Sequence, residues 1–325
     1  PGDDSNMVIT HGELLIDFVP TVTGVGLIDA PAFIKAPGGA PANVAAGLAR
    51  LGVSAGFLGQ VGDDPFGHFL AQTLRDAGVD VTTLSFSSQA RTALAFVSLR
   101  ADGERDFMFY RHPSADMLYS MTDVNVHAAA LRAARAFHFG SISLIGEPAR
   151  AATLRAIALA REGGALISYD PNLRLPLWPS SESARAGMLL GLQHAAIVKV
   201  SEEELAFLTG ASDETEALAR LWRPGLKMVA ITRGSAGSTY VTPRFRGHVP
   251  GIPVPAVDTT GAGDAFMAGL LRSVLADPGV LESEDELIRV YRFANAAGAL
   301  TATRRGAIPA LPFPEDVYRL LANLT

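Results

Sequence analysis

The stretch Asp258-Thr-Thr-Gly-Ala-Gly-Asp-Ala-Phe266 joins a glycine turn directly to an apolar run. The apolar run predicts a helix, so the turn lies at the positive end of the helix dipole. Gly261, Ala262 and Gly263 carry little or no side chain, which lets their backbone N–H groups approach an anion. Asp264 adds a carboxylate that could take a proton from a hydroxyl while the N–H groups hold a phosphoryl group. Aspartate is also a favoured helix cap, so this stretch alone leaves a structural role open.

Around this stretch, short apolar runs alternate with helical ones. Predicted strands cover residues 8–10, 14–19, 55–61, 136–139, 165–170, 196–200 and 228–232, and predicted helices cover residues 41–51, 66–77, 148–162, 184–192, 202–208 and the segment from 264. The strand runs are apolar on both faces, which is typical of a parallel sheet covered by helices. The sequence therefore predicts an α/β protein with a mostly parallel central sheet.

Two segments, residues 14–36 and 92–111, read as β-ribbons without helices. Asp102-Gly103 within the second ribbon is a strong hairpin signal. Such ribbons either form a lid over the site or decorate the surface. We expect an α/β core from residues 7–13, 37–91 and 112–325, a β-lid from residues 14–36 and 92–111, and a tag remnant at residues 1–6.

Composition narrows the class of partner. The chain has 325 residues with 48% hydrophobic side chains, enough for one large α/β core. Its formal net charge is −6, without a Lys/Arg cluster, which disfavours nucleic acid or an anionic membrane as a partner. No apolar run reaches the roughly 20 residues of a membrane span. The absence of cysteine excludes disulfides and thiolate metal sites, and fits a cytoplasmic protein.

Several common nucleotide and metal motifs are absent from the sequence. None of the three lysines (Lys35, Lys199, Lys227) follows a glycine, so the chain contains no P-loop. Gly24-Val25-Gly26 is followed by Asp29 where a dinucleotide-binding motif needs its third glycine. The seven histidines show no metal-ligand spacing.

Gly38-Gly39-x-x-x-Asn43, early in the chain, and the late Asp258–Phe266 stretch together resemble the two signatures of the ribokinase-like (PfkB) carbohydrate kinases. The resemblance covers essentially Met7 to the C-terminus and implies a three-layer sandwich with a small β-lid. Further matches resemble the fructokinase branch, at residues 12–18, 109–117, 139–145 and 170–178.

The resemblance implies a sugar site made by Asp17, Gly38, Gly39, Asn43, Phe109, Arg111 and Arg174, with Asp264 as the catalytic base and Gly261, Ala262 and Gly263 as the anion-binding turn. A polyol needs carboxylate and amide groups as hydrogen-bond partners, and glycines let it reach the backbone. The structural alternatives are a turn carboxylate for Asp17, a helix-start residue for Asn43 and a surface side chain for Arg174.

The resemblance also implies a nucleotide site made by Lys199, Glu204, Thr232, Gly234, Gly237 and Asn295, with Glu204 binding Mg²⁺ through water. Here Ser201 stands where the family has Asn, and Ser-x-x-Glu before a helix is equally a capping box. A monovalent cation, K⁺ in relatives, is implied at Asp258, Thr260, Thr301, Arg304 and Gly306, mostly through backbone carbonyls.

By resemblance, the activity is an ATP-dependent sugar kinase that phosphorylates the primary hydroxyl of D-fructose, with ATP, Mg²⁺ and K⁺ as cofactors. The alternatives are a kinase for 2-keto-3-deoxygluconate, ribose or a nucleoside, or a non-catalytic sugar- or nucleotide-binding paralogue. Apolar ribbon residues without an evident covering helix also predict a homodimer formed through the lid; these are Leu15, Phe18, Phe33, Phe96 and Phe107.

Overall fold

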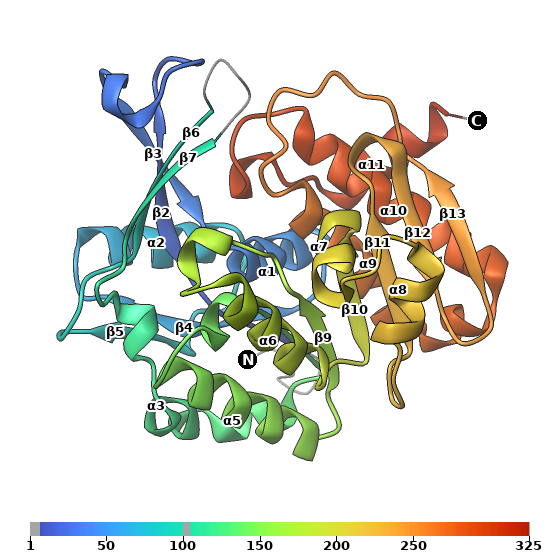
Figure 1. Ribbon diagram of the computed structural model, residues 1–325, viewed down its shortest axis with the longest axis horizontal. Coiled ribbons are helices and arrows are strands. Elements are labelled where there is room, and N and C mark those ends of the chain that lie inside the picture. Colours follow the sequence, from blue (N-terminus) through green and yellow to red (C-terminus); the bar gives the residue numbers. More distant parts are fainter. Residues whose placement is uncertain (1–6, 100–104, 325) are drawn as a thin grey trace.

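A computed structural model describes residues 7–99 and 105–324 of the chain (Figure 1). The expected tag remnant at residues 1–6 and the Asp102-Gly103 hairpin lie outside the described residues.

The core of the molecule is a nine-stranded sheet in the order β13-β12-β11-β10-β9-β8-β1-β4-β5. Its strands are β1 (Val8–His11), β4 (Ala55–Gly62), β5 (Leu84–Ser87), β8 (Ala136–Gly140), β9 (Leu166–Asp170), β10 (Ile197–Ser201), β11 (Met228–Thr232), β12 (Gly237–Val241) and β13 (Arg246–Pro250). All neighbouring strands from β5 to β11 run parallel, and β12 and β13 are added antiparallel. The predicted mostly parallel sheet is confirmed.

Helices cover both faces of this sheet and make the fold three-layered (Figure 1). One layer contains α1 (Ala40–Arg50), α2 (Pro65–Asp76), α9 (Ala262–Ala276), α10 (Glu284–Ala302) and α11 (Pro314–Ala322). The other contains α3 (Met121–Val126), α4 (Ala128–Ala133), α5 (Ala149–Glu162), α6 (Ser181–Leu192), α7 (Glu202–Thr209) and α8 (Glu214–Leu221). No helix within the described ranges has both the length and the apolar character needed to cross a bilayer.

Helices α1 and α9 pack closely because small residues face each other between them. A Cβ added to Gly47 of α1 would lie 2.8 Å from the Cβ of Ala268 of α9. One helical turn earlier on each helix stand Asn43 and Asp264, since residues four apart share a helix face. Packing of the helix interiors therefore fixes the approach of two polar side chains at their N-terminal ends.

A second, four-stranded sheet projects from the core at the upper left of Figure 1. It has the order β3-β2-β6-β7 and consists of β2 (Leu15–Pro20), β3 (Phe33–Gly38), β6 (Leu94–Leu99) and β7 (Arg105–Tyr110). The two predicted ribbons thus share one sheet, joined by parallel pairing of β2 with β6.

Aromatic rings gather on one face of this small sheet. Phe18 stacks on Phe96 with 4.8 Å between the ring centroids, and Phe33 meets Phe96 edge-on at 5.2 Å. Phe18 also contacts Phe66 of α2 at 5.8 Å, so the expectation that no helix covers these residues is wrong for Phe18. Helix α2 reaches this strand because it begins directly after β4. The side chain of Phe107 lies outside the described residues.

Candidate active site

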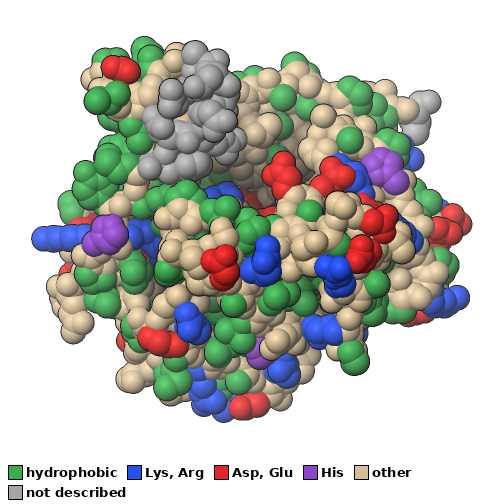
Figure 2. Space-filling model, viewed as in Figure 1, with side chains coloured by type: hydrophobic (Ala, Val, Ile, Leu, Met, Phe, Trp, Pro, Cys, Tyr) green, Lys and Arg blue, Asp and Glu red, His purple; other side chains and the backbone are tan. Residues whose placement is uncertain are grey.

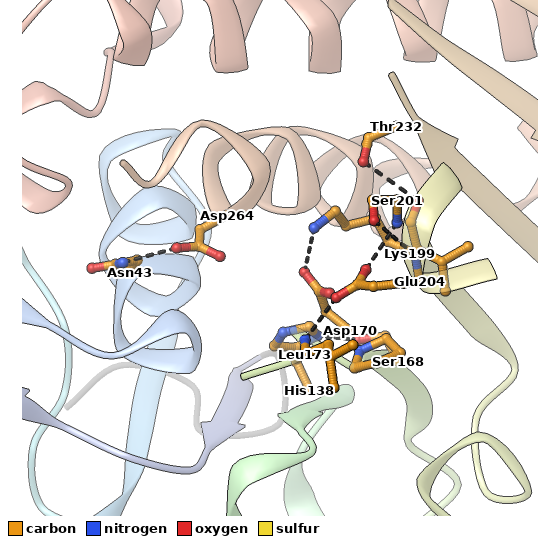
Figure 3. A network of polar contacts seen from close by, with 12 residues as sticks. Asn43, His138, Ser168, Asp170, Leu173, Lys199, Ser201, Glu204, Thr232 and Asp264 are labelled. Atoms are coloured by element: carbon orange, nitrogen blue, oxygen red, sulfur yellow. Dashed lines mark hydrogen bonds and ion pairs between the residues drawn. The ribbon is translucent and has the colours of Figure 1, made fainter. Parts of the chain in front are cut away.

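The side chains of Asn43 and Asp264 meet although they are 221 residues apart in sequence. The Asn43 amide Nδ2 donates a hydrogen bond of 2.8 Å to the Asp264 carboxylate Oδ2, and both residues are buried (Figure 3). The amide oxygen, Asn43 Oδ1, is buried without a hydrogen-bond partner among the described residues. The contact orients Asp264 and leaves an open acceptor beside it.

The glycine turn before α9 adopts the conformation that its sequence predicts. Gly261 is the N-cap with φ of 79°, and an added Cβ would lie 2.7 Å from the Cβ of Ala307, so both conformation and space require glycine. Helix α9 begins at Ala262, two residues before the expected start, which makes Asp264 its third residue.

The turn differs from expectation in one of its N–H groups. The N–H of Ala262 donates to the Thr259 carbonyl at 3.2 Å, so it is already occupied. The N–H groups of Gly261 and Gly263 have no hydrogen-bond partner in the described part of the chain. These open donors stand at the positive end of a fifteen-residue helix, an arrangement suited to a phosphoryl group.

Asp264 has an unusual carboxyl group for an aspartate. Burial raises its pKa to about 6, although Lys199 and the hydrogen bond from Asn43 act in the opposite direction. A carboxylate with its pKa near neutrality remains ionised at pH 7 and is a better proton acceptor than an ordinary surface aspartate.

A buried ion pair lies next to this turn. Lys199 Nζ is 2.6 Å from Asp170 Oδ2, with side chains 9% and 3% exposed (Figure 3). Nζ also lies 3.0 Å from the position a Cβ on Gly263 would occupy, so the ammonium fills the space that this glycine leaves open. Burial alone would lower the pKa of Lys199, but Asp170, Glu204 and Asp264 together raise it. The lysine is therefore a fixed cation at the anion-binding turn.

On the predicted sugar side, Asp17 of β2 pairs with Ala36 of β3, and its carboxylate reaches toward Gly38, two residues further along that strand. A Cβ on Gly38 would fall 2.2 Å from Asp17 Oδ2, and a Cβ on Gly39 (φ 114°) would fall 2.3 Å from the Glu13 carbonyl. Burial raises the pKa of Asp17 to about 6, against the lowering effect of Arg174. Arg174 also lowers the pKa of Asp264, so its exposed guanidinium lies within electrostatic range of both carboxylates.

Two residues of the predicted lid line a cavity, and Phe109 lies on the same face of the small sheet as Asp17, because both pair with Ala95 of β6. Phe109 and Arg111 line a cavity of about 390 Å³, together with Asp116. The Arg111 guanidinium is buried and paired with the Asp116 carboxylate. The predicted sugar contacts of Phe109 and Arg111 therefore stay predictions, and Arg111 already has a structural partner.

At the start of α7, Ser201 and Glu204 form the capping box. The Glu204 N–H donates to Ser201 Oγ at 3.1 Å, and the Ser201 N–H donates to Glu204 Oε2 at 2.9 Å. The other oxygen, Oε1, accepts from the Leu173 N–H at 2.7 Å. Each carboxylate oxygen keeps a second lone pair, so Glu204 can still accept a hydrogen bond from a metal-bound water.

The other predicted nucleotide residues gather around the end of β11. Thr232 is its last residue, and Gly234 (φ 54°) and Gly237 (φ 105°) shape the turn that follows. Asn295 of α10 is buried, accepting from Ser238 Oγ at 2.8 Å and donating to the carbonyls of Val249 and Pro250. Its amide thus ties α10 to the antiparallel strands, and an adenine contact stays a prediction.

The two segments expected to enclose a monovalent cation do lie together. Asp258 Oδ1 accepts from the N–H and the hydroxyl of Thr260, at 3.0 and 2.6 Å, and Asp258 Oδ2 accepts from the Gly306 N–H at 2.9 Å. The Thr301 hydroxyl donates to Ala297 within α10, and the Arg304 N–H donates to the Thr301 carbonyl at 3.4 Å. The carboxylate of Asp258 thus joins both segments beside the α9 turn.

Sequence reasoning assigned no role to three buried polar residues near this site. Asp170 holds Lys199, and Glu13 Oε1 accepts from the Ala40 N–H at 3.0 Å, with burial raising the pKa of Glu13 to about 7. His138 Nδ1 lies 2.9 Å from Ser168 Oγ, and burial lowers the pKa of His138 to about 3. For Asp170 and His138, a charged or polar residue inside an otherwise apolar strand was the available signal.

The fold and the anion-binding turn define the class as an α/β phosphotransferase. The site follows the general rule for such sheets, because Asp170 is the last residue of the parallel strand β9 and Lys199 lies two residues before the carboxyl end of the neighbouring strand β10. Figure 2 shows the surface hollowed between the small sheet and the core, with acidic side chains along the rim.

Comparison with known proteins gives the family. Residues 5–314 match the pfkB family carbohydrate kinase model. Fructokinase-1 of Oryza sativa subsp. japonica is 56% identical over 98% of this chain and 98% of its own. A Xylella fastidiosa fructokinase with bound ATP has a TM-score of 0.90 at 34% identity, covering 98% of both chains. A double mutant of Vibrio cholerae O395 fructokinase, with fructose, ADP and a potassium ion, scores 0.85 at 35% identity, covering 99% of this chain and 100% of its own. The chain belongs to the pfkB family of carbohydrate kinases.

Proposed function

We propose that this kinase transfers the γ-phosphoryl group of ATP to the terminal primary hydroxyl of D-fructose, giving fructose 6-phosphate and ADP. The observation that carries the proposal is the buried Asp264 carboxylate, hydrogen-bonded to Asn43 and adjacent to open N–H donors at the start of α9. The fructokinase names of relatives above 50% identity support fructose as the substrate.

In the proposed reaction, the oxygen of the sugar hydroxyl attacks the γ-phosphorus while Asp264 accepts the hydroxyl proton. The bond between the γ-phosphorus and the bridging oxygen breaks, and that oxygen leaves with ADP. The N–H groups of Gly261 and Gly263 stabilise the charge on the transferring group. Phosphoryl transfer passes through a loose transition state, in which the hydroxyl proton can leave late. The positioning of the Asp264 carboxylate by Asn43 therefore contributes as much to the rate as the basicity of that carboxylate. Glu204 would hold a water molecule of the magnesium ion that accompanies ATP, and the ion would supply charge neutralisation at the phosphates.

Lys199 is proposed to contact the nucleotide phosphates from beside Gly263. Asp170 is proposed as its positioning residue, because a buried lysine needs a fixed counter-charge to stay protonated and aimed at the turn. Thr232, Gly234 and Gly237 are proposed to contact the rest of the nucleotide. The four-stranded sheet, with Asp17 on β2, is proposed as the lid over the sugar.

Fructose is expected to exceed ribose and glucose in kcat/KM by well over tenfold. Asp17 and the open Asn43 Oδ1 would pair with sugar hydroxyls, and a buried group left unpaired costs about 1–3 kcal/mol. The measurement is a sugar panel with ATP, read by coupled ADP formation. A higher kcat/KM for 2-keto-3-deoxygluconate or ribose would leave the kinase chemistry intact and contradict the substrate.

Potassium is expected to raise turnover. We propose that carbonyls of residues 258–260 and 301–306 bind the ion, and their ordering would fix the adjacent N–H groups of the α9 turn before ATP binds. Initial rates are compared in potassium and in a large organic cation at equal ionic strength. Asp258→Asn should weaken the response, because Asp258 joins the two segments. Equal rates in both salts would contradict the site.

A homodimer is expected to form through the small sheet. Met108 and Tyr110, on the face of the sheet that carries the aromatic rings, are 42% and 56% exposed. Val19 and Ile34, on the other face, are 45% and 60% exposed. Exposed apolar side chains of this kind are usually covered in solution. Light scattering at micromolar concentration tests the mass, and Met108→Glu should weaken association. A wild-type monomer, or a dimer unaffected by lid substitutions, would contradict this interface.

With no cysteine in the chain, we also propose a cytoplasmic location.

A further inference from the structure

The turn after β11 is fixed in place by one of its own residues, Arg233. The backbone of this residue closes the turn, because the Arg233 N–H donates to the Gly237 carbonyl at 2.8 Å and the Ala236 N–H donates to the Arg233 carbonyl at 3.0 Å. The side chain is only 17% exposed and contacts three other elements. Arg233 therefore belongs to the turn and also links it to the structure around it.

Each nitrogen of the Arg233 guanidinium group has its own partner. Nη1 pairs with the carboxylate of Glu202, the first residue of α7. Nη2 pairs with the carboxylate of Glu214, the first residue of α8. Nε donates to Thr239 Oγ1 in β12 at 3.2 Å. Arginine suits such a place because its planar group offers donors in fixed directions, whereas the lysine ammonium is a point charge on a flexible stem.

An ordinary surface ion pair would not support a functional role. Exposed pairs between long side chains contribute little, because water screens them and the side chains lose entropy. Arg233 differs in being mostly buried and held by three partners at once. Arg246 of β13 provides a comparison, since it also pairs with Glu214, at 2.7 Å, but is 42% exposed and lies outside the turn.

The Arg233 contacts join two parts of the proposed nucleotide site. Ser201, the last residue of β10, pairs with Thr232, the last residue of β11, so the ends of these parallel strands lie side by side (Figure 3). Helix α7 begins directly after Ser201 and contains Glu204, two residues beyond Glu202. The pair between Arg233 and Glu202 therefore connects the turn after β11 to the helix that contains the proposed ligand of the magnesium-bound water.

We propose that Arg233 is a positioning residue for the nucleotide, which it serves by holding the turn after β11 against the start of α7. This inference rests on the proposed nucleotide contacts of Thr232, Gly234 and Gly237. Both glycines have positive φ, which shapes the turn but leaves it intrinsically flexible. A turn that is already ordered loses less entropy when the nucleotide binds, so the affinity is higher.

The test compares full-length variants by calorimetric titration of ADP in the presence of Mg²⁺ and by steady-state kinetics with the most active sugar of the panel. Arg233→Gln should weaken ADP binding and raise the KM for ATP by about fivefold or more. The KM for the sugar should stay unchanged, because the predicted sugar residues lie on β2, β3 and α1. Equal rises in both KM values, with a lower unfolding temperature, would indicate a merely structural role and overturn the proposal.

A substitution at Glu202 distinguishes positioning from a direct effect of charge. If Arg233 itself bound a phosphate, or if unpaired carboxylates only repelled the nucleotide, Glu202→Ala would strengthen ADP binding. Positioning requires the opposite sign, because Glu202→Ala breaks the link between the turn and α7. Arg233→Gln/Glu202→Ala should then bind ADP no better than Arg233→Gln. Tighter binding in Glu202→Ala, or recovery in the double variant, would contradict the proposal.

Arg246→Gln is the matched control. It removes one positive charge from the same network, at Glu214, without changing the turn. ADP affinity and both KM values should stay at the wild-type level, and a loss equal to that in Arg233→Gln would overturn the proposal. A wild-type protein that binds no ADP would contradict the proposed function together with this inference. Unchanged ADP binding in Arg233→Gln would contradict this inference alone.

Discussion

Replacing Asp264 with Asn is expected to lower turnover by about 10²–10⁴-fold, the usual range for losing a positioned base. The amide keeps the size of the side chain and a hydrogen-bond acceptor for Asn43, whose Nδ2 donates to it at 2.8 Å. Only the ability to take the proton is lost. ATP affinity should change little, since the N–H groups of Gly261 and Gly263 remain open. Steady-state rates and nucleotide titration measure the two effects separately.

A matched control distinguishes catalysis from helix capping. Asp213 caps α8, accepting from the Glu216 N–H at 2.8 Å, away from the site. Asp213→Asn should lower thermal stability slightly and leave turnover intact. Near-normal turnover in Asp264→Asn would contradict the base assignment. A collapse of ATP affinity with intact chemistry would assign Asp264 a structural role in the first turn of α9, whose N-cap is Gly261.

The wild-type pH profile supplies a further check on the same residue. Burial raises the pKa of Asp264 to about 6, and the base acts only when ionised. Turnover should therefore be full above this value and fall as the pH drops through about 6. A limb at the ordinary aspartate pKa near 4 would indicate that another group takes the proton.

The sequence predicted the parallel part of the fold well, and the reason is physical. Strands buried on both faces are mostly apolar, so β8, β9, β10 and β11 stand out from their surroundings. The edge strand β13 was not predicted, because it alternates exposed and buried residues and includes Gly247 and Pro250. Its neighbour β12 was not predicted either. Helix α10 was not predicted either, because only its segment 293–298 shows a clear apolar pattern in the sequence.

The site was predictable where local backbone geometry is encoded. The turn at Gly261 and the close approach at Gly38 both require glycine, and both were predicted. Contacts that depend on tertiary packing were not predicted. The hydrogen bond between Asn43 and Asp264 depends on Gly47 facing Ala268, and no local sequence pattern predicts that contact.

Replacing Lys199 with Met is expected to lower turnover by about 10²–10³-fold, through loss of charge stabilisation at the transferring phosphoryl group. The variant also leaves Asp170 as a buried carboxylate without its partner, which costs roughly 3–5 kcal/mol of folding free energy. Lost activity could then reflect lost structure. A second substitution, Asp170→Asn, removes that charge, so Lys199→Met/Asp170→Asn should recover most of the stability, measured by urea unfolding, while turnover stays low.

The acid limb of the pH profile separates the two residues further, because they act on Asp264 with opposite signs. Lys199 lowers the pKa of Asp264 and Asp170 raises it. Lys199→Met should therefore move the acid limb to higher pH, and Asp170→Asn alone should move it to lower pH. A merely structural pair would change stability and leave the limb in place. Recovery of wild-type turnover in the double variant would contradict a role for Lys199 in catalysis. Low turnover in Lys199→Met together with an acid limb at higher pH would give the lysine two roles. Its ammonium group beside Gly263 would keep Asp264 ionised, and it would stabilise the phosphoryl group that the sugar hydroxyl attacks.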